Sequence, residues 1–202
     1  AARLRSQERL ARSHADRTTA LYALAHELAT AVDMDDVLRV AATQIGTVFD
    51  AETAILPTTG DTLARQPHAG GTLAIDDKEY SVAVWAFENR KAAGRFTDTL
   101  PLASAHFIPL QTPDRTVGVL AIRSRKGVRL SFEQEQLLEA FAGQIALSIE
   151  RELLDEAAAQ TAMSRESERL FTTLLNSISH ELRTPIATIA GASSSLLDAQ
   201  PN

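Results

Sequence analysis

The chain has 202 residues, with 20 Lys and Arg against 26 Asp and Glu, so its formal net charge is −6 at pH 7. It has no Cys, which excludes disulfide scaffolds, thiolate metal sites, Cys nucleophiles and chromophores attached through a thioether. Its 45% of hydrophobic residues can form a core, and its acidic balance argues against nucleic-acid binding through a broad basic surface. With no apolar run of about 18 residues and no signal peptide, the sequence is typical of a soluble cytosolic chain.

The N-terminal segment is basic, unlike the rest of the chain. Residues 1–17 hold five Arg against Glu8 and Asp16, a local charge of 5 − 2 = +3. One interpretation is a solvated helix face. The other is a segment beside an anionic membrane leaflet, where each basic residue is worth about 1 kcal/mol. The basic residues proposed for the membrane interpretation are Arg3, Arg5, Arg9 and Arg12. The chain starts without Met, as expected of a piece cut from a longer protein.

Two helices are predicted before residue 50. Apolar residues at helical spacing over 21–32 predict the first. Asp33, with Asp36 three residues later, predicts the N-cap of a second helix over 37–49.

A strand, a loop and a third helix are predicted next. Residues 52–56 predict the strand, 57–60 a turn, and 61–76 a short strand and a loop. Residues 77–90 predict a helix with one apolar face and a plausible end at Gly94. The residues expected on that face are Tyr80, Val84 and Phe87.

Two paired strands complete the domain. Residues 105–111 and 116–123 flank a turn at 112–115, and the second strand is nearly all apolar, so we expect it at the centre of a sheet. The element order up to residue 130 predicts an α+β domain, with an antiparallel sheet and helices on its faces.

A long helix is predicted from Ser131 onward. Its first part can pack on the domain, whereas residues 151–169 are rich in Ala and charged residues. Apolar residues then recur in steps of 4, 3, 4 and 7, which predicts a coiled-coil seam. The seam residues are Phe171, Leu175, Ile178, Leu182 and Ile189. We expect a homodimer through this seam, or a further helix of the same polypeptide that covers it.

The run SHELRTP, residues 179–185, resembles the H-box of sensor histidine kinases. The resemblance implies that His180 attacks the γ-phosphorus of ATP while Glu181 accepts the proton from the other ring nitrogen. Thr184, one turn further, would help to place the water that dephosphorylates the response regulator. Pro185 lacks an N–H and should kink the helix beside His180, either as a hinge or as a tolerated bend.

The preceding domain resembles a GAF domain, and more closely that of the KdpD family of potassium-responsive sensor histidine kinases. The segments that carry this resemblance are VAVWAFENRKAAGRFTDTLP (82–101), FIPL (107–110), VGVLAIR (117–123), LLEAFAGQIALSIER (137–151) and GASSSLL (191–197). It implies a GAF-like antiparallel sheet flanked by helices, followed by a long C-terminal signalling helix. It also implies membrane helices upstream, which would make the chain the cytoplasmic part of a bacterial inner-membrane protein.

The same resemblance predicts the partners and the organisation. We expect an Arg-rich juxtamembrane helix (1–17), a GAF-like sensor domain (18–150), a signalling-helix linker (151–170) and the first dimerisation helix (171–202). A KdpE-like response regulator would receive the phosphate, and the chain itself would not contact nucleic acid. ATP and Mg would be bound by a domain outside these 202 residues, so the chain alone should be inactive and hold no cofactor.

A ligand pocket between the sheet and a flanking helix is a further expectation, since GAF domains often hold a small molecule there. Its candidate residues are Trp85, Phe87, Thr97, Asp98, Thr99 and Phe107. The alternative interpretation of the run TDT, residues 97–99, is a loop whose side chains form hydrogen bonds with the neighbouring backbone. Spacing supports no haem or metal site at His26, His68 or His106. The competing hypothesis for the whole chain is a stand-alone GAF ligand-binding or adaptor protein whose H-box is non-functional or phosphorylated in trans.

Overall fold

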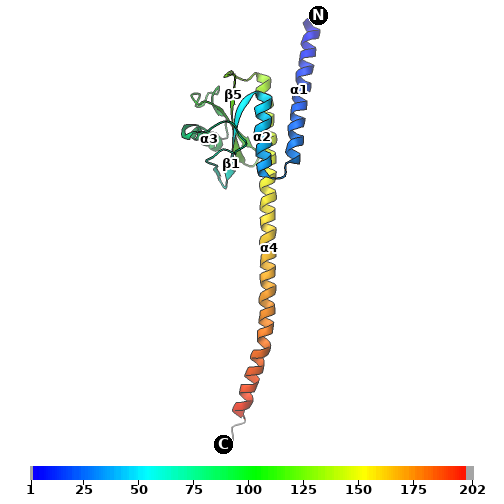
Figure 1. The fold of residues 1–202 in the computed structure, drawn as a ribbon, viewed down its shortest axis with the longest axis vertical. Helices are drawn as coiled ribbons and strands as arrows, with labels where there is room; N and C mark the ends of the chain where they lie inside the picture. Colours follow the sequence, from blue (N-terminus) through cyan, green and yellow to red (C-terminus); the bar gives the residue numbers. More distant parts are fainter. Residues whose placement is uncertain (1, 199–202) are drawn as a thin grey trace. The chain divides into compact units, whose positions relative to one another are not determined.

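The computed structural model describes the backbone of residues 2–198 and the side chains of residues 15, 17–175 and 178. The chain divides into two compact units, the first ending at Leu153 and the second beginning at Leu154. The helices and strands are α1 (Ala2–Thr30), α2 (Met34–Phe49), β1 (Ala51–Thr59), β2 (Thr62–Leu63), α3 (Asp77–Asn89), β3 (Ala93–Gly94), β4 (His106–Gln111), β5 (Thr116–Ser124) and α4 (Phe132–Asp198) (Figure 1).

The first unit is built on a five-stranded antiparallel sheet with the strand order β2-β1-β5-β4-β3. Strand β5 lies at its centre, as its apolar sequence predicted. Alternate residues of β5 face opposite sides, so Leu120 and Ile122 join one core cluster while Val119 and Ala121 join the other. The predicted α+β class with an antiparallel sheet and flanking helices is confirmed.

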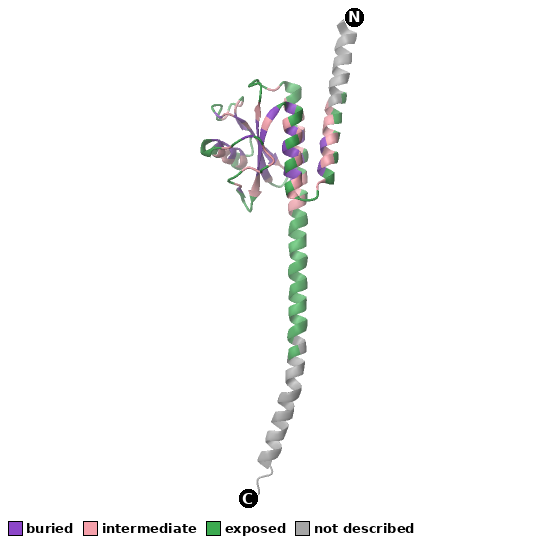
Figure 2. Ribbon diagram, viewed as in Figure 1, coloured by how far each residue is buried: buried purple, intermediate pink, exposed green. Residues whose placement is uncertain are grey.

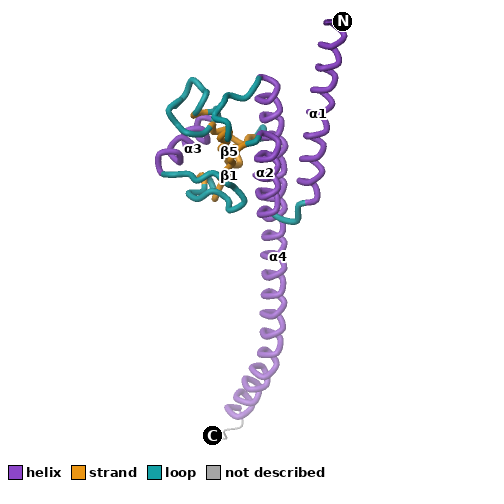
Figure 3. The backbone as a smooth tube through the Cα atoms, turned by 45° about the horizontal axis from the view of Figure 1, so that its top comes forward, coloured by secondary structure: helices purple, strands orange, loops and turns teal. Residues whose placement is uncertain are grey.

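Helices cover both faces of this sheet. Helices α1 and α2 and the first turns of α4 cover one face, where Ile45, Phe141 and Ile145 are fully buried. Helix α3 covers the other face, so the strands lie between α3 on one side and α2 with α4 on the other (Figure 3).

The buried face of α3 differs from the prediction. The fully buried residues of α3 are Ala83 and Ala86, whereas the predicted Tyr80, Val84 and Phe87 are half-buried around the same core cluster. Alanines allow the helix backbone to approach the sheet closely, so the large side chains flank the contact rather than fill it. Periodicity of bulky residues therefore identified α3 as a helix but misplaced its buried face.

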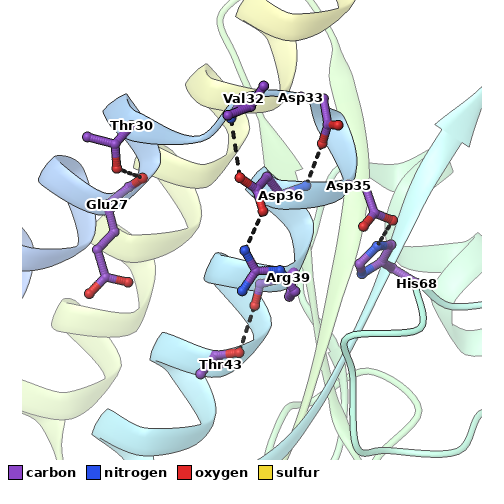
Figure 4. Close-up of polar contacts among 9 residues, drawn as sticks. All are labelled: Glu27, Thr30, Val32, Asp33, Asp35, Asp36, Arg39, Thr43 and His68. Carbon is purple, nitrogen blue, oxygen red and sulfur yellow. Dashed lines mark hydrogen bonds and ion pairs between the residues drawn. The ribbon is translucent and has the colours of Figure 1, made fainter.

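The predicted N-caps are confirmed. The Asp36 N–H donates to Asp33 Oδ1 at 2.9 Å, and Asp36 Oδ2 accepts the Val32 N–H at 3.4 Å (Figure 4). At the start of α4 the Gln134 N–H donates to Ser131 Oγ at 3.3 Å, while the Ser131 N–H donates to Gln134 Oε1 at 2.9 Å. Each pair satisfies backbone N–H groups that have no partner within the helix.

Two predicted boundaries were wrong. Strand β1 continues past the expected turn at Pro57 and ends at Thr59, because Pro57 still pairs with Gly118 of β5. Helix α3 ends at Asn89, where Arg90 takes a left-handed conformation with φ of 54°. Gly94, predicted as the helix end, belongs to β3 and has φ of 94°.

Helix α4 is continuous in its backbone from Phe132 to Asp198, including Pro185. Its first turns pack in the core, whereas the described side chains from Leu154 onward are exposed, as Figure 2 shows in green. The predicted seam residues Phe171, Leu175 and Ile178 are 63%, 48% and 50% exposed. Those at 182 and 189 lie outside the residues whose side chains are described.

Candidate functional site

The predicted phosphoacceptor segment lies on α4, in the second unit. The backbone of residues 179–185 is helical, so positions 180 and 184 share one face of the helix. The side chains of His180, Glu181, Thr184 and Pro185 lie outside the described residues. Their roles, and the kink expected at Pro185, stay predictions.

The basic N-terminal segment is helical in α1, but the side chains of Arg3, Arg5, Arg9 and Arg12 also lie outside the described residues. Arg17 is described, and its guanidinium donates to Gln136 Oε1 at 3.0 Å. This bond joins α1 to the first turns of α4 within the first unit. None of the described helices is long and apolar enough to cross a membrane.

The six predicted pocket residues do not share one site. Phe107 is fully buried under α3, and Trp85 and Phe87 pack around the same cluster. By contrast, Thr97, Asp98 and Thr99 line a groove of about 560 Å³ that also contacts Ile108 and Leu138, which belong to the opposite core. The expected pocket is thus split between the two faces of the sheet.

The threonines at 97 and 99 organise the loop between β3 and β4. The Thr97 hydroxyl lies 2.7 Å from both the Gly94 and Thr99 carbonyl oxygens, and it accepts the Thr99 N–H at 3.2 Å. The Gly94 N–H donates to the Thr99 carbonyl at 2.8 Å. The alternative interpretation of TDT, side chains that cap neighbouring backbone, therefore describes Thr97, whereas Asp98 is exposed in the lining of the groove.

The other walls of this groove come from elements far apart in sequence. Strand β4 contributes His106, α4 contributes Glu135 and Glu139, and the segment before α4 contributes Arg129. Arg129 Nε donates to Glu135 Oε1 at 3.0 Å. Within the described part of the chain, Asp98 and Glu139 form no ion pair. The groove thus contains one ion pair, between Arg129 and Glu135, and two further carboxylates, those of Asp98 and Glu139.

His106 of β4 is a half-buried side chain in the lining of this groove. Its Nε2 is buried without a hydrogen-bond partner among the described residues. Burial lowers the pKa of His106; the nearby Glu135 opposes this shift and Arg129 adds to it. The imidazole is therefore neutral at neutral pH. Spacing along the sequence gave His106 no haem or metal partner and did not mark the ring as buried, although a His inside an apolar strand was the signal available.

His68 has a structural role beside α2 (Figure 4). Its Nδ1 accepts the Gly70 N–H at 3.1 Å, so in the neutral ring the proton lies on Nε2, which donates to Asp35 Oδ1 at 2.7 Å. The bond to Asp35 joins the loop before α3 to the first turn of α2, and the bond from Gly70 orients the ring within that loop. Among the residues that the structure describes, no cluster of three or more His, Cys, Asp or Glu could hold a metal ion.

The family of this chain follows from its match to the model of a known domain family. The model of the GAF domain family matches residues 33–151, more than half of the chain, so this chain belongs to the GAF domain family. Its fold agrees with a crystallised part of a methyl-accepting chemotaxis protein (residues 122 to 287), at a TM-score of 0.52 and 19% identity, over 66% of this chain and 99% of that chain.

Within this class the chain is similar to KdpD sensor proteins. It is 32% identical over 190 residues to the Escherichia coli (strain K12) protein and 29% identical over 189 residues to that of Clostridium acetobutylicum. These alignments cover 93% and 90% of this chain but 21% of each relative, so the chain spans about a fifth of their length. The crystal structure of the GAF domain of the E. coli potassium sensor histidine kinase KdpD matches with a TM-score of 0.61 and 28% identity, over 70% of this chain and 99% of that chain.

Proposed function

We propose that this chain is the sensor and signal-transmission part of a KdpD-like two-component histidine kinase. The alignment with the E. coli protein carries the proposal. At 93% coverage of 202 residues, one contiguous match must extend past position 180, and so it includes the H-box as well as the GAF domain. Helix α4 joins the two, because its first turns pack in the GAF core and the same helix continues through the motif.

The chemistry proposed for the H-box uses two side chains. A neutral imidazole has a lone pair for attack, so one ring nitrogen of His180 forms a bond to the γ-phosphorus while the bond to the ADP oxygen breaks. Glu181 takes the proton from the other ring nitrogen. The phosphoryl group then passes to an Asp of a response regulator that controls potassium uptake. Thr184 helps to place the water that later dephosphorylates this response regulator. ATP and Mg are bound by a separate domain of the kinase.

A homodimer through α4 belongs to the same proposal. Five exposed apolar side chains lie close together in the second unit: Leu170, Phe171, Leu174, Leu175 and Ile178, each 48–63% exposed. Their spacing includes the 4 and 3 residue steps of a coiled coil, and such a patch favours a second copy of the helix. The Arg-rich start of α1 would lie beside the membrane, on its cytoplasmic side.

The dimer has a direct test. Phe171→Glu should raise the dimer dissociation constant more than about tenfold, because a buried apolar side chain is worth about 1.5–3 kcal/mol. Thr173→Glu, on the opposite side of the helix, is the matched control and should leave the dimer intact. Light scattering over a dilution series measures the dimer dissociation constants of the parent and the two variants. A parent chain that stays monomeric, or equal dissociation constants of the two variants, contradicts a dimer contact through this seam.

The test of the phosphoacceptor uses the full-length natural protein. After incubation with ATP and Mg, phosphate that resists alkali but is lost in acid should label the parent and the His26→Gln control, and not His180→Gln. Adding the response regulator should then transfer the label to it. A folded, ATP-binding parent that shows no such label would refute the proposed chemistry and favour a stand-alone GAF adaptor.

A further inference from the structure

A polar network at the β4–β5 turn joins two helices that lie on opposite faces of the sheet. Helix α3 packs on one core cluster and α4 on the other, so the strands separate them. At the end of α3, the Arg90 guanidinium donates to the Thr112 carbonyl at 3.1 Å, and the Gln111 side-chain amide donates to the Arg90 carbonyl at 2.8 Å. On the other side, the Thr112 hydroxyl lies 3.0 Å from Glu150 Oε1 of α4. Residues 111 and 112 reach different helices because consecutive side chains along a strand face opposite sides of the sheet.

The centre of this network is shielded from water. Thr112 is 4% exposed, and the side chain of Glu150 is 17% exposed. Polar groups with so little access to water need partners within the protein, and a hydrogen bond to a charged group is stronger than one between neutral groups. Glu150 lies three residues before Leu153, the last residue of the first unit. The contact therefore holds α4 to the domain close to the point where the helix leaves it.

The Thr112 hydroxyl has one proton and two acceptors within reach. Besides Glu150 Oε1 at 3.0 Å, the Arg115 carbonyl oxygen lies 3.2 Å from Thr112 Oγ1 across the turn. The Arg115 N–H donates to the same Oγ1 at 3.4 Å, and Arg115 Nε donates to Glu150 Oε1 at 3.3 Å. Donation to Glu150 links the turn to α4, whereas donation to the Arg115 carbonyl keeps the bond within the turn. A buried group with two discrete arrangements is the kind of element through which distant parts of a protein are coupled.

We propose that the Thr112 hydroxyl couples the end of α3 to α4 by choosing between these two acceptors. A displacement of Arg90 moves the Thr112 carbonyl to which it donates, and with it the hydroxyl of the same residue. When the hydroxyl turns to the Arg115 carbonyl, Glu150 keeps only the half-exposed Arg115 guanidinium of this network, so the turn of α4 around residue 150 opens more easily. Control of a kinase by this coupling rests on the proposed function, but the coupling itself does not.

Hydrogen exchange in the 202-residue chain, measured without ATP, tests the coupling. Arg90→Asn removes the guanidinium but places there a residue type that tolerates the left-handed conformation of this position. It should speed exchange of the α4 amides of residues 150–153 about fivefold, which is within the range of couplings inside one hydrogen-bond network. Lys91→Asn removes an exposed positive charge from the next position and is the matched control, with an expected change of less than twofold.

The same substitution is then made in chains that lack the link. Thr112→Val keeps the shape of the side chain without its hydroxyl, and Glu150→Ala removes the acceptor. In either background, Arg90→Asn should change α4 exchange by less than twofold. Glu150→Ala provides the answer if Val in the turn impairs folding, because position 150 lies inside a helix and Ala favours helix. Thr112→Ser keeps a hydroxyl and should keep the response to Arg90→Asn.

Three results would overturn the proposal. One is an unchanged rate of α4 exchange in Arg90→Asn. Another is the same acceleration in the Thr112→Val or Glu150→Ala background as in the parent, which would mean that the effect bypasses the hydroxyl. The third is equal acceleration by Lys91→Asn, which would indicate a general loosening of α3. None of these measurements involves phosphorylation of His180, so this proposal and the proposed kinase function fail separately.

Discussion

The closest backbone approach at the edge of the sheet is at Gly94, and it predicts opposite effects for two Gly→Ala substitutions. A Cβ at Gly94 would overlap the carbonyl oxygen of Ala105 and lie 3.0 Å from Phe107 Cδ2. The φ of 94° adds strain for any L side chain. In α4, by contrast, a Cβ at Gly143 would meet no atom within 4 Å.

The size of each effect follows from this geometry. Gly94→Ala should cost about 3 kcal/mol or more, since an unfavourable φ costs about 1–3 kcal/mol and an overpacked contact about as much. Gly143→Ala should gain up to about 1 kcal/mol from its higher helix propensity. At about 3 °C per kcal/mol for a domain of this size, the unfolding temperature should fall by roughly 10 °C in the first variant and rise by roughly 3 °C in the second.

Thermal unfolding followed by tryptophan fluorescence measures both variants. The chain has a single Trp, Trp85, which packs half-buried beside the core under α3, so its emission reports on the first unit. Comparing both variants with the parent in one buffer cancels effects common to any Gly→Ala change. If Gly94→Ala unfolds within 1 °C of the parent, or if Gly143→Ala is the less stable of the two, the reasoning from backbone contact is refuted.

Four further substitutions test the fold in urea unfolding. Asp33→Ala should cost about 1 kcal/mol because it removes the N-cap of α2, and an unchanged midpoint would contradict that role. Phe107→Ala should cost about 3–5 kcal/mol, since the ring is fully buried, whereas Phe132→Ala at a 69% exposed site should cost less than about 0.5 kcal/mol; similar costs would refute the assigned burial. His106 has a folded-state pKa below its unfolded value, so the stability that its neutral form contributes should be lost as pH falls below about 6.5. The parent's advantage over His106→Gln should then be smaller at pH 5.5 than at pH 7.5, and a pH-independent difference would contradict the burial of the ring.

Local sequence signals predicted the elements because the forces that specify them act over a few residues. The aspartate at 33 satisfies an N–H three residues ahead, and the apolar run of β5 is long enough to require burial on both faces. The same holds for the helical spacing of α4, which the structure extends without a break from Phe132 to Asp198.

Positions that depend on distant neighbours could not be predicted in this way. Gly94 looks like a helix end in sequence, but its role comes from the Ala105 carbonyl across the β3–β4 pair. The alanines of α3 have a weak hydrophobic signal, although Ala83 and Ala86 are its fully buried residues. In both cases the deciding factor is the space left by another element, which no local pattern encodes.

The sequence by itself determined the class of the domain, its antiparallel sheet, its principal helices and caps, and the resemblance of residues 179–185 to an H-box. Tertiary structure alone decided which polar groups share a site. It separated Phe107 from Asp98 by placing them on opposite faces of the sheet, and it brought Asp98, His106 and Glu139 to one groove from a loop, a strand and a helix. The physical reason is that elements and caps arise from neighbours along the chain, whereas a groove forms where strands and helices distant in sequence pack together.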